Sequence, residues 1–256
     1  MVAPLVTIAV PSYNQGQFLD EALASIFNQN VPVEVFVLDG GSTDNSVAVI
    51  NKWAHRLAGW RSHPDHGQAA AINEGVALGK APLVCWLNSD DFFLPDGLDR
   101  LVNALADHPQ APMAYGRTWD QQDGADGQPG ARKRSLVFPF NEWLMAQLCI
   151  VSQPGTLIRR TCWDAVGGLD GSLHMALDYD LWWRLYRQFG KPWLLDGYVA
   201  VNRVHGATKT NTQRRLHYEE AMTVVKTHYG RVPLKWFLAW PYAVWWRSMF
   251  AESPHP

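Results

Sequence analysis

Three apolar runs without polar alternation constrain the fold of this chain most strongly. They span 5–10, 33–38 and 83–87, and polar residues follow each of them. Strands of this kind are buried on both faces, as in a parallel sheet covered by helices. Between them, 18–28 and 68–78 show the apolar spacing of helices. The sequence therefore predicts an α/β fold, with a mostly parallel, Rossmann-like central sheet flanked by helices.

Length and composition are those of one large globular domain. The chain has 256 residues, of which 47% are hydrophobic and 18% are charged. A net charge of −2 gives no electrostatic argument for a nucleic-acid partner. Three cysteines without CxxC spacing fit a reducing cytosol. No basic leader opens the chain, and no apolar run reaches the roughly 18 residues of a membrane span, so we expect a cytoplasmic protein.

Polar residues follow the ends of the three apolar runs. Asn14 lies beyond the first run, Asp39 follows the second, and Asn88-Ser89-Asp90-Asp91 follows the third. Open α/β sheets bind ligands beyond the carboxyl ends of their strands. Adjacent carboxylates repel each other, and hard Mg²⁺ or Mn²⁺, which often has phosphates as its other partners, would stabilise them. The pattern therefore indicates a nucleotide cleft that holds a divalent cation.

Several blocks in order resemble the inverting family-2 glycosyltransferases of the GT-A fold, as found in bacterial surface-polysaccharide synthesis. They are PSYNQGQFLDEALASIFNQ, VFVLDGGSTDNSVAVI and PDHGQAAAINEGVALGKAPLVCWLNSDD. The resemblance covers about 4–205 and implies a GT-A catalytic domain. We expect that domain at 1–210, with a nucleotide-sugar-binding half at 1–118, an acceptor-binding half at 136–210, and a helical, Trp-rich extension at 211–256. The Gly- and Asp-rich stretch 120–135 is interpreted as a mobile surface loop.

The resemblance also implies which residues bind the nucleotide-sugar donor. Tyr13 would stack on a base, and Asp39 would contact it. An acid at the position of Asp39 is more often a cap for the next helix, a role that Asp44 fits equally well. The D-x-G loop at Asp65 would lie against the nucleotide, with His66 either beside it or simply solvated. The implied donor-binding residues are Pro11, Tyr13, Asn14, Asp39, Asp65, Gly67 and Asp90.

For the metal, the resemblance assigns Asp91 as a ligand and Asp90 mainly to the ribose or an outer-shell role. His205 would complete the binding of the metal or the diphosphate, or would be structural. Arg203 and Lys209 would either contact phosphate oxygens or lie on a solvated surface. The cation, Mn²⁺ or Mg²⁺, would bridge the donor phosphates and stabilise the leaving diphosphate.

The second motif is LDYDLWW, which resembles the family pattern Glu-Asp-x-Asp-Leu-Trp at the start of a helix under the acceptor site. Its first aspartate, Asp178, would act as the general base, because an acceptor hydroxyl needs its proton removed. An acid favoured at a helix start is the alternative. Leu177 stands where the family has glutamate. Asp180, two residues on, would be a cap or part of a structural salt bridge.

Acceptor residues and the C-terminus carry weaker signals. By resemblance, Gln153 would contact a sugar, and Trp182 and Trp183 would form an acceptor wall unless they pack in the core. The aromatic segment 234–250 has basic flanks. Peripheral contact with membrane headgroups and packing on the domain or in a homodimer remain open alternatives for it.

Together these observations predict a metal-dependent, inverting, hexosyltransferase-type glycosyltransferase. It would move a sugar from a nucleotide diphosphate sugar to a hydroxyl of a sugar or lipid-linked glycan, in cell-surface polysaccharide or lipopolysaccharide biosynthesis. It would work at the inner face of the plasma membrane. One alternative is a non-catalytic nucleotide- or sugar-binding module of a membrane-associated assembly, which Leu177 favours. A sugar nucleotidyltransferase fits less well, because PSYNQGQF lacks its Gly-rich, basic loop.

Overall fold

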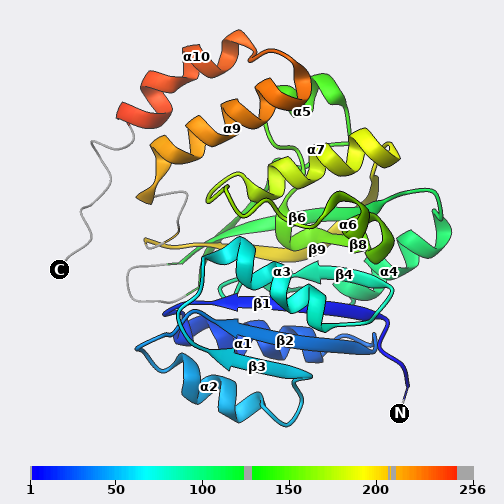
Figure 1. The fold of residues 1–256 in the computed structure, drawn as a ribbon. Helices are drawn as coiled ribbons and strands as arrows, with labels where there is room; N and C mark the ends of the chain where they lie inside the picture. The colour runs from blue at the N-terminus through cyan, green and yellow to red at the C-terminus, as the bar shows by residue number, and fades with distance from the viewer. Residues whose placement is uncertain (1, 124–128, 207, 209–211, 247–256) are drawn as a thin grey trace.

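The three apolar runs form adjacent strands of one sheet in the computed structural model, which describes residues 2–123, 129–206, 208 and 212–246 (Figure 1). The strand from the first run lies between the other two, with Val10 opposite Val37 and Ala9 opposite Trp86. A short fourth strand extends this parallel part. The four strands are β1 (Val6–Ser12), β2 (Val33–Asp39), β3 (Gly59–Ser62) and β4 (Leu83–Trp86).

Beyond β4 the sheet is mixed, and its order is β3-β2-β1-β4-β8-β6-β9-β5, with β7 on β6. β6 and β9 are parallel to each other, whereas β8 pairs antiparallel with both β4 and β6. The predicted α/β class is thus confirmed, and its parallel part is the N-terminal half. The further strands are β5 (Phe92–Phe93), β6 (Met113–Asp123), β7 (Pro129–Arg134), β8 (Thr156–Arg159) and β9 (Trp193–Val204).

Helices cover both faces of the sheet, and each face has its own core (Figure 1). Side chains alternate along the strands, so Ile8 and Val10 face one core while Ala9 faces the other. One core includes residues of α1 (Gly16–Phe27), α2 (Ser46–Trp53) and α4 (Gly97–Asp107). The other includes residues of α3 (Gln68–Leu78), α5 (Glu142–Gln147), α6 (Arg160–Val166), α7 (Leu177–Phe189), α9 (Arg214–Tyr229) and α10 (Leu234–Trp240).

The prediction that 120–135 is a surface loop is wrong for its described residues. β6 continues to Asp123 and β7 begins at Pro129, and the two strands pair antiparallel, with Trp119 opposite Arg134. The β7 side chains are exposed. A strand at the margin of a sheet is held by main-chain hydrogen bonds and needs no apolar side chains. The polar sequence of β7 therefore did not indicate a strand.

The C-terminal extension is helical where it is described, and it packs beyond α7 on the side away from the sheet (Figure 1). His228 of α9 lies 2.8 Å from the Asp180 carboxylate of α7. The indole of Trp236 in α10 donates a hydrogen bond of 2.8 Å to the Ala146 carbonyl of α5. A π-helical turn, Pro241–Trp246, follows α10. Within the described residues, no helix combines the length and apolar character needed to cross a membrane.

Candidate functional site

The loops that follow β1 and β2 are bonded to each other, as the strand-end pattern predicted. The Asn14 amide donates to the Ser42 hydroxyl at 2.8 Å, and the Thr43 amide donates to the Asn14 side-chain oxygen at 2.8 Å. Asn14 adopts a φ of 52°, a left-handed conformation that asparagine tolerates better than most residues. Asn14 therefore lies at the shared edge of the two strands.

Two residues predicted to contact the nucleotide are buried instead. Asp39 is fully buried, and its carboxylate accepts hydrogen bonds from the Ser42 amide at 2.9 Å and the Ser62 hydroxyl at 2.6 Å. Pro11 is buried within β1, opposite Leu38. Contact of both residues with the nucleotide stays a prediction. A buried carboxylate needs hydrogen-bond donors, and Asp39 uses them to hold the turn after β2.

Tyr13, Gly40 and Asp65 come together on the open side of these loops. The Tyr13 side chain is exposed, at 63%. A Cβ at Gly40 would lie 3.3 Å from the Tyr13 ring and 3.7 Å from the Asp65 carboxylate. A side chain at position 40 would crowd the Tyr13 ring, and glycine leaves that space open. The predicted neighbourhood of Tyr13 and Asp65 is therefore present.

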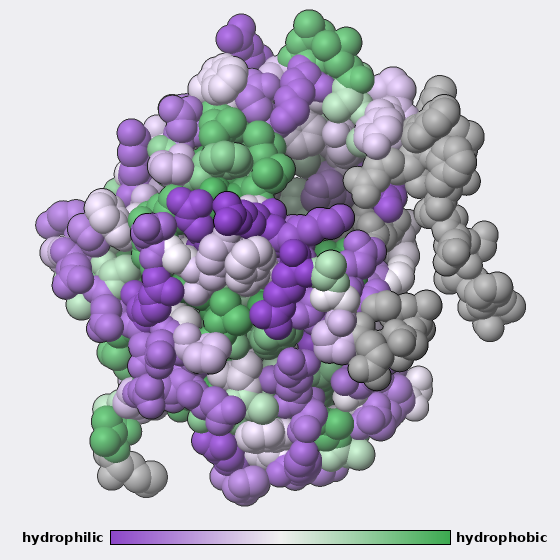
Figure 2. Space-filling model, turned by 180° about the vertical axis from the view of Figure 1, so that it is seen from behind, coloured by the Kyte–Doolittle hydropathy of each residue, from purple (hydrophilic) through white to green (hydrophobic). Residues whose placement is uncertain are grey.

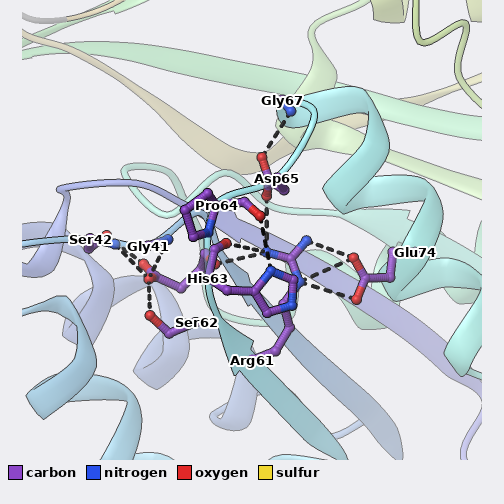
Figure 3. Close-up of polar contacts among 10 residues, drawn as sticks. Gly41, Ser42, Arg61, Ser62, His63, Pro64, Asp65, Gly67 and Glu74 are labelled. Carbon is purple, nitrogen blue, oxygen red and sulfur yellow. Dashed lines mark hydrogen bonds and ion pairs between the residues drawn. The ribbon is translucent and has the colours of Figure 1, made fainter.

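Arg61 holds the Asp65 loop in place, and sequence reasoning missed it (Figure 3). Its guanidinium donates to the Asp65 carboxylate at 3.0 Å, to the Asp39 carbonyl at 2.8 Å and to Glu74 at 2.6 Å. Asp65 in turn accepts from the Gly67 amide at 2.9 Å, and Gly67 adopts a φ of +98°. An arginine within a short strand was the only sequence signal, because its partners lie on other elements.

Asp90 and His205 meet at the end of β4. The Asp90 Oδ2 atom lies 3.0 Å from His205 Nε2 and accepts a hydrogen bond of 3.1 Å from the Gln15 side chain. Ser89 donates to the same Gln15 side chain, and the His205 ring packs 4.8 Å from the Phe18 ring. Sequence reasoning missed Gln15. Elements far apart in the chain thus converge on one carboxylate.

Asp91 differs from its neighbour in its burial and its partners, and its assignment to the metal stays a prediction. Only 1% of Asp91 is exposed. Its carboxylate accepts from the Arg203 amide at 2.9 Å and from the Asn88 side chain at 3.1 Å. Burial, together with the neighbouring charge of Asp90, raises the pKa of Asp91. Both carboxylate oxygens therefore bond within the protein, and Asp90 is the acid of the pair that lies beside His205.

Arg203 is neither a phosphate contact nor a solvated residue. It is buried and forms ion pairs with Glu21 and Asp123, the latter at 2.9 Å. Its guanidinium also donates to the Asp90 carbonyl at 2.9 Å. Arg203 therefore ties the end of β9 to the segment after β4. The other cation considered, Lys209, lies outside the described residues.

The residues at this edge fit a divalent cation that shares its coordination with a substrate. Mn²⁺ binds carboxylate oxygens and imidazole nitrogens. Asp90 and His205 offer one ligand of each kind. Across the residues that the structure describes, no group of three or more His, Cys, Asp or Glu side chains could hold a metal. Mg²⁺ in nucleotide sites commonly uses one or two carboxylates and the substrate phosphates, so two protein ligands suffice.

Asp178 occupies the first turn of α7, as predicted for the general base. It is half-buried, and its carboxylate accepts a 2.7 Å hydrogen bond from the Tyr179 amide. Burial raises the pKa of Asp178 from 3.8 to about 6, although that hydrogen bond lowers it in part. A carboxylate with this pKa is ionised at neutral pH and is a stronger base than an ordinary aspartate.

A cavity of about 140 Å³ lies between the Asp65 loop and the start of α7. The segment just before α7 supplies His174 and Met175 to its wall, and Leu177 adds an apolar side chain. The facing wall includes Gly67 and Gln68. The cavity therefore joins the loop of the predicted nucleotide site to the helix that carries Asp178.

Both tryptophans considered for an acceptor wall are core residues, which is the alternative that the sequence left open. Trp182 is buried and stacks on Trp86 of β4, with ring centres 5.8 Å apart. Trp183 is buried and stacks on His228 of α9, at 6.0 Å. Asp180 is the structural acid that we expected, since it pairs with Arg184 at 2.6 Å as well as with His228.

Gln153 lies beside the acidic motif. Its side chain donates to the Trp86 carbonyl at 2.9 Å and accepts from Asn88 at 3.1 Å. Asn88 also accepts from Gln68 at 2.8 Å, at the amino end of α3. Gln153 is half-buried, and its contact with an acceptor sugar remains a prediction.

Solved structures share this fold. The crystal structure of S. aureus TarS 1-349 in complex with UDP-GlcNAc aligns with a TM-score of 0.69 at 17% identity, covering 87% of this chain and 66% of that one. The mannosyltransferase PcManGT from Pyrobaculum calidifontis, in complex with GDP-Man and Mn²⁺, aligns with a TM-score of 0.69 at 19% identity, covering 97% and 74%. The fold and the family match below define a glycosyltransferase of the GT-A class, as predicted.

The chain belongs to glycosyl transferase family 2, whose model matches residues 7–165. It is 28% identical over 223 residues to a chondroitin synthase of Pasteurella multocida, covering 84% of this chain and 22% of that protein. It is 27% identical over 222 residues to an uncharacterized glycosyltransferase of Rickettsia typhi, covering 82% and 67%. The chain thus spans only 22% of the synthase.

The raised pKa of Asp178 predicts a pH-dependent cost to stability. Because its pKa is about 6 in the folded protein and ordinarily 3.8, the folded state loses stability as the pH rises through this interval. Asp178→Asn removes the ionisation, so we expect a higher free energy of unfolding than the parent at pH 7.5 and a smaller difference at pH 4. Urea denaturation at both pH values measures this.

The matched control is Asp196→Asn, because the Asp196 side chain is 97% exposed. We expect it to leave stability close to that of the parent at both pH values. An Asp178→Asn protein that is less stable than the parent at pH 7.5 would contradict the proposed cost of burying this charge.

Proposed function

We propose that this glycosyltransferase is metal-dependent and inverting, and that it moves a hexose from a nucleotide diphosphate sugar to a hydroxyl acceptor. The observation that carries the proposal is the convergence of Asp90 and His205, 3.0 Å apart, on the sheet edge that also carries Tyr13 and Asp65. The related folds with bound UDP-GlcNAc, and with GDP-Man and Mn²⁺, support a donor of this kind.

On the donor side, the exposed Tyr13 ring would stack on the base, beside Asp65 and the backbone around Asn14 and Gly67. Asp90 and His205 would hold Mn²⁺ or Mg²⁺ against the diphosphate, which revises the roles first assigned to Asp90 and Asp91. When bound, the cation would supply Lewis-acid stabilisation of the leaving group. Gln15 and Ser89 would orient the Asp90 carboxylate.

On the acceptor side, Asp178 would be the general base. It would take the proton of the acceptor hydroxyl while that oxygen bonds to the anomeric carbon and the bond from this carbon to the diphosphate breaks. Attack on the face opposite the leaving group inverts the anomeric centre. The cavity before α7 would admit the acceptor, with Gln153 nearby. We retain 1–210 as the catalytic domain and 211–256 as its extension.

We place the reaction in the synthesis of a surface polysaccharide, near a membrane. Relatives named chondroitin synthase and hyaluronan synthase support a polysaccharide product, although this chain spans 22% of each. α10 exposes an apolar stripe, and Figure 2 shows hydrophobic side chains at the end of the molecule where α10 lies. The stripe consists of Leu234, Phe237 and Leu238, exposed by 69%, 54% and 72%, and Tyr242 in the π-helical turn after α10 is exposed by 64%.

The alternative of a non-catalytic binding module makes a different prediction about turnover. We expect purified protein with Mn²⁺ to transfer or slowly hydrolyse at least one nucleotide sugar in a panel. We expect Asp178→Asn to bind the nucleotide normally and to lose transfer by at least the roughly 10²-fold typical of a lost general base. Near-normal transfer by this variant would show that another residue is the general base. Nucleotide binding without any turnover by the parent would favour the binding module.

The revised metal assignment is tested through nucleotide affinity. Asp90→Asn removes a carboxylate charge beside His205, so we expect Mn²⁺-dependent binding of UDP or GDP to weaken by about 10-fold or more. Calorimetric titration with and without Mn²⁺ measures this. Asp96→Asn is the control, because Asp96 is an exposed residue in a left-handed turn that asparagine tolerates. Unchanged metal dependence in Asp90→Asn would rule the assignment out.

Membrane contact through α10 is tested with lipid vesicles. We expect the parent to co-sediment with vesicles rich in phosphatidylglycerol, and Leu238→Glu to stay in solution, because a charge opposes insertion of the stripe. Leu78→Glu is the control, since Leu78 is 55% exposed on α3. If both variants co-sediment as the parent does, or if the parent does not bind, the membrane proposal is wrong. A parent that dimerises through this face would favour the homodimer.

A further inference from the structure

We propose that Glu220 of α9 positions the segment that carries the general base. This inference rests on the proposed role of Asp178. The Glu220 carboxylate accepts hydrogen bonds from three consecutive main-chain amides, those of His174 at 3.0 Å, Met175 at 2.7 Å and Ala176 at 3.0 Å. These amides immediately precede α7. A carboxylate that accepts hydrogen bonds from three amides holds their segment firmly, because such charge-assisted hydrogen bonds are stronger than neutral ones.

The amino end of α7 needs this support from outside. Its N-cap is Ala176, which has no side-chain oxygen to accept from the first free amides of the helix. Leu177, where the family pattern has glutamate, is apolar and buried. A negative charge at the amino end of a helix is favourable. Glu220, which belongs to α9, therefore places a carboxylate at the amino end of α7. Leu177, at the same end, has no acidic side chain.

Glu220 is itself well anchored. α9 is held to α7 through the contact between His228 and Asp180 at 2.8 Å, and the His228 ring stacks on Trp183. α9 also buries Val224 and Val225 in the core that it shares with α7. The carboxylate is thus presented from a helix fixed to the same element whose start it holds. This geometry makes Glu220 a positioning residue, which acts through the segment before α7.

The segment held by Glu220 faces the cavity. His174 and Met175 belong to the cavity wall, and Asp178 follows within the first turn of α7. A displacement of this segment would move both the wall and the base. The Glu220 carboxylate bonds to the amides before α7, whereas the proposed donor side is built around Asp90 and His205 on other elements. The inference therefore predicts an effect on catalysis and the acceptor, with donor binding intact.

Glu220→Gln keeps the shape of the side chain but removes its charge and one acceptor oxygen. We expect kcat for sugar transfer to fall about 10- to 100-fold, the scale of a small displacement of a catalytic group. We expect the Kd for UDP or GDP with Mn²⁺ to stay within about twofold of the parent. Glu219→Gln is the matched control, because the side chain of the neighbouring Glu219 forms an exposed pair with Arg215 at 2.8 Å; it should transfer as the parent does.

Two results would overturn the inference. One is a Glu220→Gln enzyme whose kcat equals that of Glu219→Gln. The other is a parallel loss of nucleotide binding and kcat, which would indicate a general structural defect. Asp178→Asn, assayed alongside, separates this inference from the proposed function. If Asp178→Asn transfers normally, the base assignment fails; if it is inactive while Glu220→Gln transfers normally, only the role of Glu220 fails.

Discussion

The site depends on one buried interaction, the hydrogen bond from the Arg203 amide to the Asp91 carboxylate at 2.9 Å. It joins the segment after β4 to the end of β9. A buried carboxylate without donors would cost at least about 1–3 kcal/mol, so this pairing and the bond from Asn88 stabilise the fold. Because His205 lies two residues beyond Arg203, the same pairing brings the imidazole to Asp90. The buried Asp91 thus helps to place its neighbour Asp90 beside His205.

The two ends of the site are built differently. The donor end rests on loops at the carboxyl edge of the parallel strands, tied together by Asn14 and Arg61. The acceptor end rests on α7, whose start is held from the C-terminal extension by Glu220. Burial that raises the pKa of Asp178 to about 6 destabilises the folded protein at neutral pH and makes Asp178 a stronger base for its proposed role. That opposition between stability and activity is common at functional sites.

The local pattern of apolar residues predicted the fold well. The errors concern residues whose contacts lie far away in the sequence. The apolar runs correctly indicated β1, β2 and β4, because burial on both faces leaves a clear signature. The hairpin of β6 and β7 was missed because main-chain pairing leaves little trace in a polar sequence. The contacts of Arg61 and Glu220 join segments that the sequence does not place together. The burial of Asp39 and Asp91 could not be predicted, because residue type does not reveal burial, and Trp182 and Trp183 follow the core alternative that the sequence left open.

The most direct test of this account is the position of the metal in a crystal of the protein grown with UDP or GDP and Mn²⁺. Manganese gives an anomalous scattering signal that locates the ion without assumptions about its ligands. We expect the peak between the Asp90 carboxylate, His205 and the diphosphate, with Asp91 still bonded to the Arg203 amide. A peak at Asp91, or one away from both Asp90 and His205, would contradict the division of roles between the two adjacent aspartates.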